Sequence, residues 1–185
     1  MLYLTIAVVL VGALCVLDLL LTLGVVRRLR EHTELLSAPR TDMSSDVIAA
    51  GRRPAAFTAA DADGVPVGLD DLAADALLGF FTPSCPACTE RLPDFLALAA
   101  RVPGGRDKVV AVVAGGLGPD GSVAGEAADL VARLGGVARV LPEAHDGPVS
   151  AAFQVVAYPS WVLMDGAEVG ASAVGMDRLP SPVPA

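Results

Sequence analysis

Positive charge is scarce in this 185-residue sequence, which has 13 Lys and Arg residues against 21 Asp and Glu, for a formal net charge of −8. Lys108 is its only lysine. Binding to a phosphate backbone requires a basic surface, so the charge balance argues against nucleic acid as a partner. Cysteine is also scarce, with three residues in all. Only two of them lie close together in the sequence, and two are too few to close a structural zinc site.

The N-terminal apolar segment lacks the features of a cleavable signal peptide, which are a basic start, a short apolar core and a small-residue cleavage site. Residues 2–26 form an apolar run with a single charge, Asp18. As a helix rising ~1.5 Å per residue, this run is longer than the ~30 Å hydrocarbon core of a membrane. We therefore predict one uncleaved transmembrane helix over residues 1–26.

The composition divides the rest of the chain into three regions. Residues 27–53 begin as an amphipathic stalk and continue as a segment of Pro, Ser, Asp, Gly and Arg without apolar periodicity, which indicates a linker. Residues 54–175 form the predicted globular domain. Residues 176–185 are a Pro-rich tail, and three prolines in the final six residues exclude a helix there.

Strand and helix patterns alternate along the globular domain and then end in a hairpin. Continuous apolar runs predict buried strands at residues 77–81 and 109–114, and shorter signals predict a strand at 139–141. We expect helices at residues 86–100, 122–134 and 147–155, a short helical turn at 69–75, and hairpins pairing 56–58 with 65–67 and 161–164 with 168–174. This order predicts an α/β sandwich with a central mixed sheet.

The sequence motif with the clearest chemistry is Cys85-Pro86-Ala87-Cys88, which follows the first buried strand and opens a helix. Two thiols one helical turn apart can close a disulfide ring and open it again. Cys85 at the helix N-terminus meets unpaired N–H groups and the positive end of the helix dipole, which favour a thiolate. Because the thiolate is the nucleophile in disulfide exchange, we predict that Cys85 attacks and Cys88 resolves the mixed disulfide.

Two sequence segments about 70 residues apart together resemble a known fold. The dithiol after a buried strand, followed by AYPSWVLMDG at residues 157–166, resembles the thioredoxin fold. The opening hairpin at residues 55–69 resembles the TlpA-like membrane-anchored thioredoxins, and within that group the chain is most similar to the MauD-type accessory proteins of methylamine utilisation. The resemblance implies a cis peptide bond before Pro159, with this proline facing the dithiol as a third site residue.

The resemblance has three departures around the dithiol. Ser84 stands where these proteins usually have a tryptophan, and Gly79 stands where ordinary thioredoxins have a buried aspartate. TlpA-like reductases often have a glutamate three residues after the second cysteine, where this chain has Arg91, and Glu90 lies one residue early. Two interpretations of Arg91 stay open, a group that holds a thiolate and an ordinary surface arginine.

The family resemblance also implies a cellular setting. It implies client proteins with cysteines or disulfides, a membrane electron donor that re-reduces the dithiol, and no cofactor. Arg27, Arg28 and Arg30 directly follow the predicted anchor, and the positive-inside rule alone would place the domain in the cytoplasm. Proteins of this family place the domain outside the membrane, and we expect that orientation.

Three alternative functions are compatible with the same residues. Thr82 and Cys85 have the Thr-x-x-Cys spacing of a peroxidase, although Leu78 stands where that motif has proline. The two thiols could join His145 or Met164 around copper or zinc, although copper-delivery proteins of this fold use a longer Cys spacing. The pair could also be an inert disulfide in a binding module, although so small a loop gains little from closure.

Overall fold

The computed structural model describes residues 46–118 and 120–175 of the chain. It also describes isolated positions near the N-terminus: Met1, Tyr3, Thr5, Ile6, Leu10, Gly12, Leu14 and Cys15. Most of the predicted anchor, most of the stalk and linker, and the Pro-rich tail lie outside the described residues. Among the residues that are described, no helix combines the length and apolar character needed to cross a membrane.

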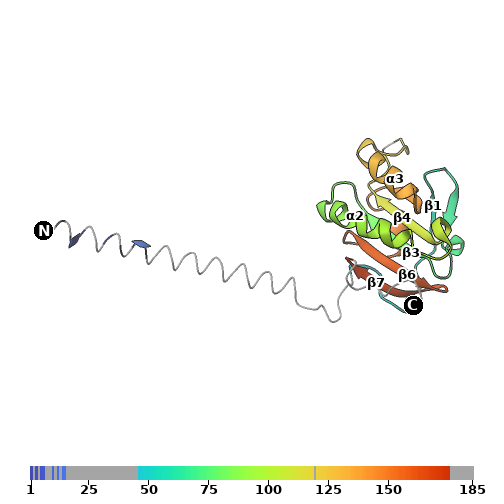
Figure 1. Cartoon of the computed structure of the whole chain (residues 1–185), viewed down its shortest axis with the longest axis horizontal. Coiled ribbons are helices and arrows are strands. Elements are labelled where there is room, and N and C mark those ends of the chain that lie inside the picture. Colours follow the sequence, from blue (N-terminus) through green and yellow to red (C-terminus); the bar gives the residue numbers. More distant parts are fainter. Residues whose placement is uncertain are drawn as a thin grey trace. The chain divides into compact units, whose positions relative to one another are not determined.

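The centre of the domain is a five-stranded mixed sheet with the strand order β5-β4-β3-β6-β7 (Figure 1). The three strands β3, β4 and β5 run parallel, whereas β6 is antiparallel to β3 and β7 is antiparallel to β6. Their bounds are β3 Leu77–Phe81, β4 Val109–Ala114, β5 Arg139–Glu143, β6 Ser160–Asp165 and β7 Glu168–Val174. The predicted mixed sheet is therefore confirmed.

Alternate residues of the central strand β3 enter two separate cores, one on each face of the sheet. Leu77 and Phe81 belong to one core, and Leu78 and Phe80 belong to the other. Side chains alternate along a strand, so a strand covered on both faces needs a continuous apolar run. This is why the residues at 77–81 show no alternation of polar and apolar residues.

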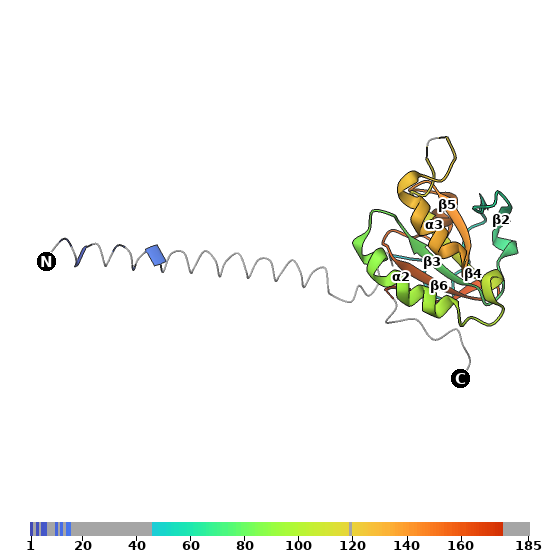
Figure 2. The ribbon, with the colours of Figure 1, turned by 45° about the horizontal axis from the view of Figure 1, so that its top comes forward.

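Helices α2 (Pro86–Ala99) and α3 (Ala128–Gly135) lie on the same face of the sheet (Figure 2). Both contribute to the core that contains Phe81, and α2 does so through Leu92 and Phe95. Helix α4 (Pro148–Ala152) contributes to the core on the other face. The layers are those of the predicted sandwich. Three short 3₁₀ helices complete the fold: η1 Leu69–Asp71, η2 Gly105–Lys108 and η3 Gly125–Ala127.

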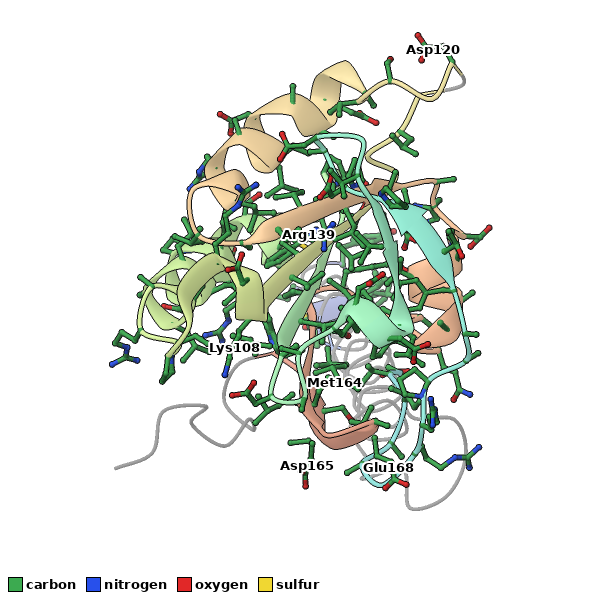
Figure 3. All side chains as sticks on the ribbon, turned by 90° about the vertical axis from the view of Figure 1, so that its right-hand side faces the viewer. Lys108, Asp120, Arg139, Met164, Asp165 and Glu168 are labelled. Atoms are coloured by element: carbon green, nitrogen blue, oxygen red, sulfur yellow. The ribbon has the colours of Figure 1, made fainter. Side chains whose placement is uncertain are left out.

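The hairpin of β1 (Thr58–Ala60) and β2 (Pro66–Gly68) forms a second, two-stranded sheet. Asp61 organises its turn by accepting the N–H groups of Asp63 and Val65. The same buried carboxylate accepts the Arg139 Nε–H at 2.8 Å, which ties the hairpin to β5 (Figure 3). Burial opposes ionisation of Asp61, but these hydrogen bonds outweigh it and hold the pKa below its usual value.

The domain begins earlier in the chain than the predicted boundary at Pro54. Val47 and Ile48 are 3% and 2% exposed and belong to the core that contains α4. The Ile48 N–H donates to the Phe153 carbonyl at 2.8 Å, and the Ser172 hydroxyl donates to the Ile48 carbonyl at 2.6 Å. The last part of the predicted linker is therefore part of the domain. Val47 and Ile48 begin an apolar stretch of only four residues, 47–50, which is too short to show a periodicity, so the sequence pattern did not reveal this packing.

The segment at 122–134, predicted as one helix, folds as several pieces. Leu117 and Val123 form an isolated antiparallel bridge, η3 follows, and only then does α3 begin at Ala128. Ser122, the first residue of the predicted helix, donates its hydroxyl to Asp120 at 2.7 Å. Local hydrogen bonding between short polar side chains competes with helix initiation, and here it forms a turn.

Gly79, in the centre of β3, has no room for a larger side chain. A Cβ there would lie 2.8 Å from Phe95 Cε2 and 2.9 Å from Phe81 Cε2, and both rings are fully buried. We predict that Gly79→Ala lowers the free energy of unfolding by about 1–3 kcal/mol, because packed rings cannot swing away. Urea unfolding measures this change. Gly135→Ala is the control, since a Cβ at Gly135 meets no atom within 4 Å, and it should not destabilise the domain.

Candidate active site at the dithiol

The structure places Cys85 at the N-cap of α2 and Pro86 at the first helical position. The Cys88 N–H donates to the Cys85 sulfur at 3.3 Å, so a backbone donor at the helix start faces the first thiol. Both residues are free cysteines; Cys85 is partly exposed, whereas Cys88 is 2% exposed. The accessible thiol is thus the one predicted to attack, and the buried thiol is the one predicted to resolve the mixed disulfide.

The environment of Cys88 keeps its thiol protonated. Burial, together with the adjacent Cys85, raises the pKa of Cys88 to about 12, against a backbone hydrogen bond from Thr82 that lowers it. A thiol with this pKa is a poor nucleophile until it loses its proton, because the thiolate is the reactive form. The arrangement favours Cys85 as the first thiol to react.

Tyr158 and Pro159 lie beside the dithiol although they are far from it in the sequence. The Tyr158–Pro159 peptide bond is cis, as the resemblance implied. The Cys85 thiol donates to the Tyr158 carbonyl across 3.6 Å. Pro159 is buried and directly precedes β6, which pairs with β3, so the two halves of the site meet at one end of the sheet. The structure therefore brings Cys85, Cys88 and Pro159 together.

An aromatic cluster of Phe81, Phe95 and Trp161 fills the core that contains Cys88. Trp161 stacks on Phe95 with ring centroids 5.1 Å apart, and Phe81 meets both rings edge-on. Trp161 pairs with Gly79 across β3 and β6, where ordinary thioredoxins would have a buried carboxylate. Aromatic rings occupy that space, so no acid reaches Cys88 from this strand position.

Arg91 pairs with Asp94 at 3.5 Å, one turn along α2. Its side chain is 42% exposed. Glu90 is also exposed. This geometry favours the interpretation of Arg91 as a surface arginine.

The predictions from sequence did not include a buried carboxyl group that the structure places near the Tyr158 side chain. Glu143, at the end of β5, is 2% exposed and accepts the N–H groups of Val149 at 2.9 Å and Ser150 at 3.0 Å. The Ser150 hydroxyl also donates to Glu143, and the Tyr158 hydroxyl donates to Ser150 Oγ at 3.4 Å. Burial raises the pKa of Glu143, against the hydrogen bonds from Ser150 and Val149 that lower it.

The residues of the alternative metal site do not meet at the dithiol. Met164 lies in the core on the opposite face of the sheet from Cys88 and is drawn next to Asp165 on the β6–β7 hairpin (Figure 3). Met164 is four steps along the strand from Ser160, or about 13 Å at the usual rise per residue. His145 is exposed, with its ring 6.3 Å from that of Tyr158. Within residues 46–118 and 120–175 the structure contains no group of three His, Cys, Asp or Glu side chains that could hold a metal.

The comparisons with known proteins point to one fold. A candidate thioredoxin from Neisseria meningitidis is 26% identical, with 68% of this chain and 81% of that chain covered and a TM-score of 0.53. The chain has a thioredoxin-like fold. A thio-disulfide isomerase from Thermus thermophilus has the same fold at 21% identity, with 70% and 88% covered and a TM-score of 0.52. No family model and no curated protein matches the sequence.

A third similar structure is a candidate thiol:disulfide interchange protein, DsbE, from Chlorobium tepidum. It is 20% identical, with 71% of this chain and 89% of that chain covered and a TM-score of 0.50. The structural neighbours of the domain are thus thioredoxin-like thiol–disulfide oxidoreductases, and the Cys85–Cys88 pair lies at the start of α2.

The unequal environments of the two thiols predict unequal alkylation. With a pKa of about 12, only about one Cys88 thiol in ten thousand is ionised at pH 8. We expect iodoacetamide to modify Cys85 in the reduced chain at least tenfold faster than Cys88, because the thiolate is the reactive form. Fragment-ion mass spectrometry of the peptide that holds both residues measures the two rates. Equal rates would contradict the arrangement, and a Cys85→Ser variant gives the rate of Cys88 alone.

Proposed function

We propose that this chain is a thiol–disulfide oxidoreductase that acts on cysteines or disulfides of client proteins. One observation carries the proposal: a partly exposed Cys85 at a helix N-cap, a buried Cys88 one turn later, and the Tyr158 carbonyl 3.6 Å from the Cys85 sulfur. Thiol exchange needs an accessible first thiol and a second thiol that reaches it within the same protein. Both conditions are met by the geometry at the start of α2.

The proposed reaction begins from the reduced dithiol. The Cys85 thiolate attacks one sulfur of a client disulfide, which forms a mixed disulfide and releases the other client sulfur as a thiolate. Cys88 then loses its proton and attacks Cys85, which forms the Cys85–Cys88 disulfide and releases the second client sulfur. The client gains two electrons and two protons, and the enzyme pair loses them. Pro159, buried beside the thiols, shapes the groove for the client backbone.

The cellular setting of the proposal rests on the resemblance to the TlpA-like and MauD-type proteins and on the apolar run at the N-terminus. We propose that residues 1–26 anchor the chain in the cell membrane and that the domain faces the extracytoplasmic side. A membrane electron donor would then supply the two electrons that return the Cys85–Cys88 disulfide to the dithiol. No cofactor enters the reaction, since both electrons pass through sulfur.

The reduction potential of the dithiol tests the proposed reaction. We predict one reversible two-electron transition when the detergent-solubilised chain is equilibrated with glutathione or dithiothreitol. Emission from Trp161, the only tryptophan, reports the transition because its ring lies in the same core as Cys88. A midpoint near or below about −250 mV would make the protein a reductant, and one above about −150 mV a disulfide donor. With dithiothreitol, absence of a transition, as expected for the Cys88→Ser control that cannot close the Cys85–Cys88 disulfide, would refute the redox function.

Labelling of Cys85 tests the proposed orientation. We predict that a maleimide unable to cross membranes modifies Cys85 in intact spheroplasts that express the reduced chain. The Cys85 thiol is partly exposed in the domain, and the proposed orientation puts the domain outside the membrane. Mass spectrometry identifies the labelled residue, and a Cys85→Ser variant shows the background from the other cysteines. Labelling that requires lysis would place the domain in the cytoplasm.

A further inference from the structure

We propose that Glu143 is a positioning residue for disulfide exchange, and that it acts through the Ser150 hydroxyl on Tyr158, whose carbonyl faces the Cys85 thiol. The inference rests on the proposed function, because it assumes that Cys85 exchanges disulfides. It adds a buried carboxylate on β5 to a site otherwise built from the start of α2 and the residues before β6. Three successive contacts connect the Glu143 carboxylate to the Cys85 thiol.

The first contact is between Glu143 and the beginning of α4. The carboxylate accepts the N–H groups of Val149 and Ser150, which are unpaired donors at a helix start, and so takes the role of a helix cap. The N-cap residue itself is Gly147, which has no side chain to do this. A Cβ at Gly147 would overlap the Glu143 carboxylate, so the glycine leaves the space that the carboxylate occupies.

The second contact extends the network beyond a helix cap. The Ser150 hydroxyl donates its single proton to Glu143, which leaves its oxygen to accept from the Tyr158 hydroxyl at 3.4 Å. In its ionised form the Glu143 carboxylate can only accept hydrogen bonds, and this form fixes the direction of both bonds. Hydrogen bonds to a charged acceptor are also stronger than neutral ones and polarise the next bond in a chain.

The third contact is made by the main chain of Tyr158. Its hydroxyl is held by Ser150, while its carbonyl accepts the Cys85 thiol at 3.6 Å and its peptide bond to Pro159 is cis. The ring packs against both cores, so the residue is held from the two faces of the sheet. In the proposal, the packed ring transmits a displacement of the hydroxyl end to the carbonyl that faces Cys85.

The groups around Tyr158 keep its hydroxyl a hydrogen-bond donor. Burial raises the pKa of Tyr158, the bond to Ser150 lowers it, and the negative charges of Glu143 and Asp146 raise it. A phenol that stays protonated continues to donate to Ser150. Two other titratable groups lie beside Tyr158, namely the Cys85 thiol at its carbonyl and the exposed His145 ring, whose centroid is 6.3 Å from the Tyr158 ring.

The test compares two substrates with the full chain in detergent micelles. A peptide disulfide must lie along the residues before β6, whereas the small disulfide 5,5′-dithiobis(2-nitrobenzoate) needs only an accessible Cys85. We expect Glu143→Gln to lower the second-order rate constant for the peptide about tenfold and to leave the rate constant for the small disulfide nearly unchanged. The reason is that a binding surface misplaced by a fraction of an ångström slows only a reaction that needs an oriented substrate. Glu90→Gln is the matched control, because it removes one exposed carboxylate from α2 and should change neither rate.

A double-mutant cycle separates positioning from general destabilisation. Tyr158→Phe removes only the hydroxyl, and we expect the double variant Glu143→Gln, Tyr158→Phe to be no slower than the slower single variant, because both break one chain of contacts. Additive losses, or equal losses with both substrates, would overturn the inference.

If Glu143→Gln does not fold, Ser150→Ala with Tyr158→Phe gives the same cycle. A wild-type chain that reduces neither substrate would refute the proposed function, whereas an active wild type with an equally active Glu143→Gln would refute only the positioning role.

Discussion

The antiparallel pairing of β3 with β6 is the constraint on which the dithiol site depends. Phe80 lies opposite Ser160 in this register, so the residues after β3 and the residues before β6 meet at the same end of the sheet. Cys85 comes from the first segment and Pro159 from the second. A slip of one residue would turn every side chain of β6 to the other face, and both cores would lose their members. The site is therefore fixed by the same hydrogen bonds and burial that hold the sheet together.

The two faces of the sheet serve the site in different ways. The face under α2 is aromatic and apolar; Cys88 is buried there and keeps its proton. The face under α4 carries the buried Glu143, whose hydrogen-bond partners are backbone N–H groups and the Ser150 hydroxyl. Tyr158 packs against both faces at the end of the sheet. The central strand has Gly79 and no carboxylate at that position. The domain instead has a buried carboxylate on β5, which is connected to Tyr158 through the Ser150 hydroxyl.

The sequence was sufficient for features that local chemistry encodes. The strands at 77–81 and 109–114 have the predicted bounds, because uninterrupted apolar runs identify strands covered on both faces. The dithiol and the cis bond before Pro159 were found from a motif and a family resemblance. Glu143 was missed, since its partners at 149 and 150 are set by the position of α4 and no local pattern marks a buried glutamate. Val47 and Ile48 and the bridge between Leu117 and Val123 were missed for the same reason: tertiary contacts decide them.

The ion pair between Asp61 and Arg139 has a consequence for how the domain behaves among its own copies. β5 is the outermost strand of the five, and an outermost strand presents free N–H and C=O groups to any other extended chain. The turn of the β1–β2 hairpin lies against it, since Arg139 binds Asp61 and the Ala62 N–H donates to the Val140 carbonyl at 2.8 Å. The hairpin thereby shields part of this border from strand addition by a second copy of the domain or by any other extended chain.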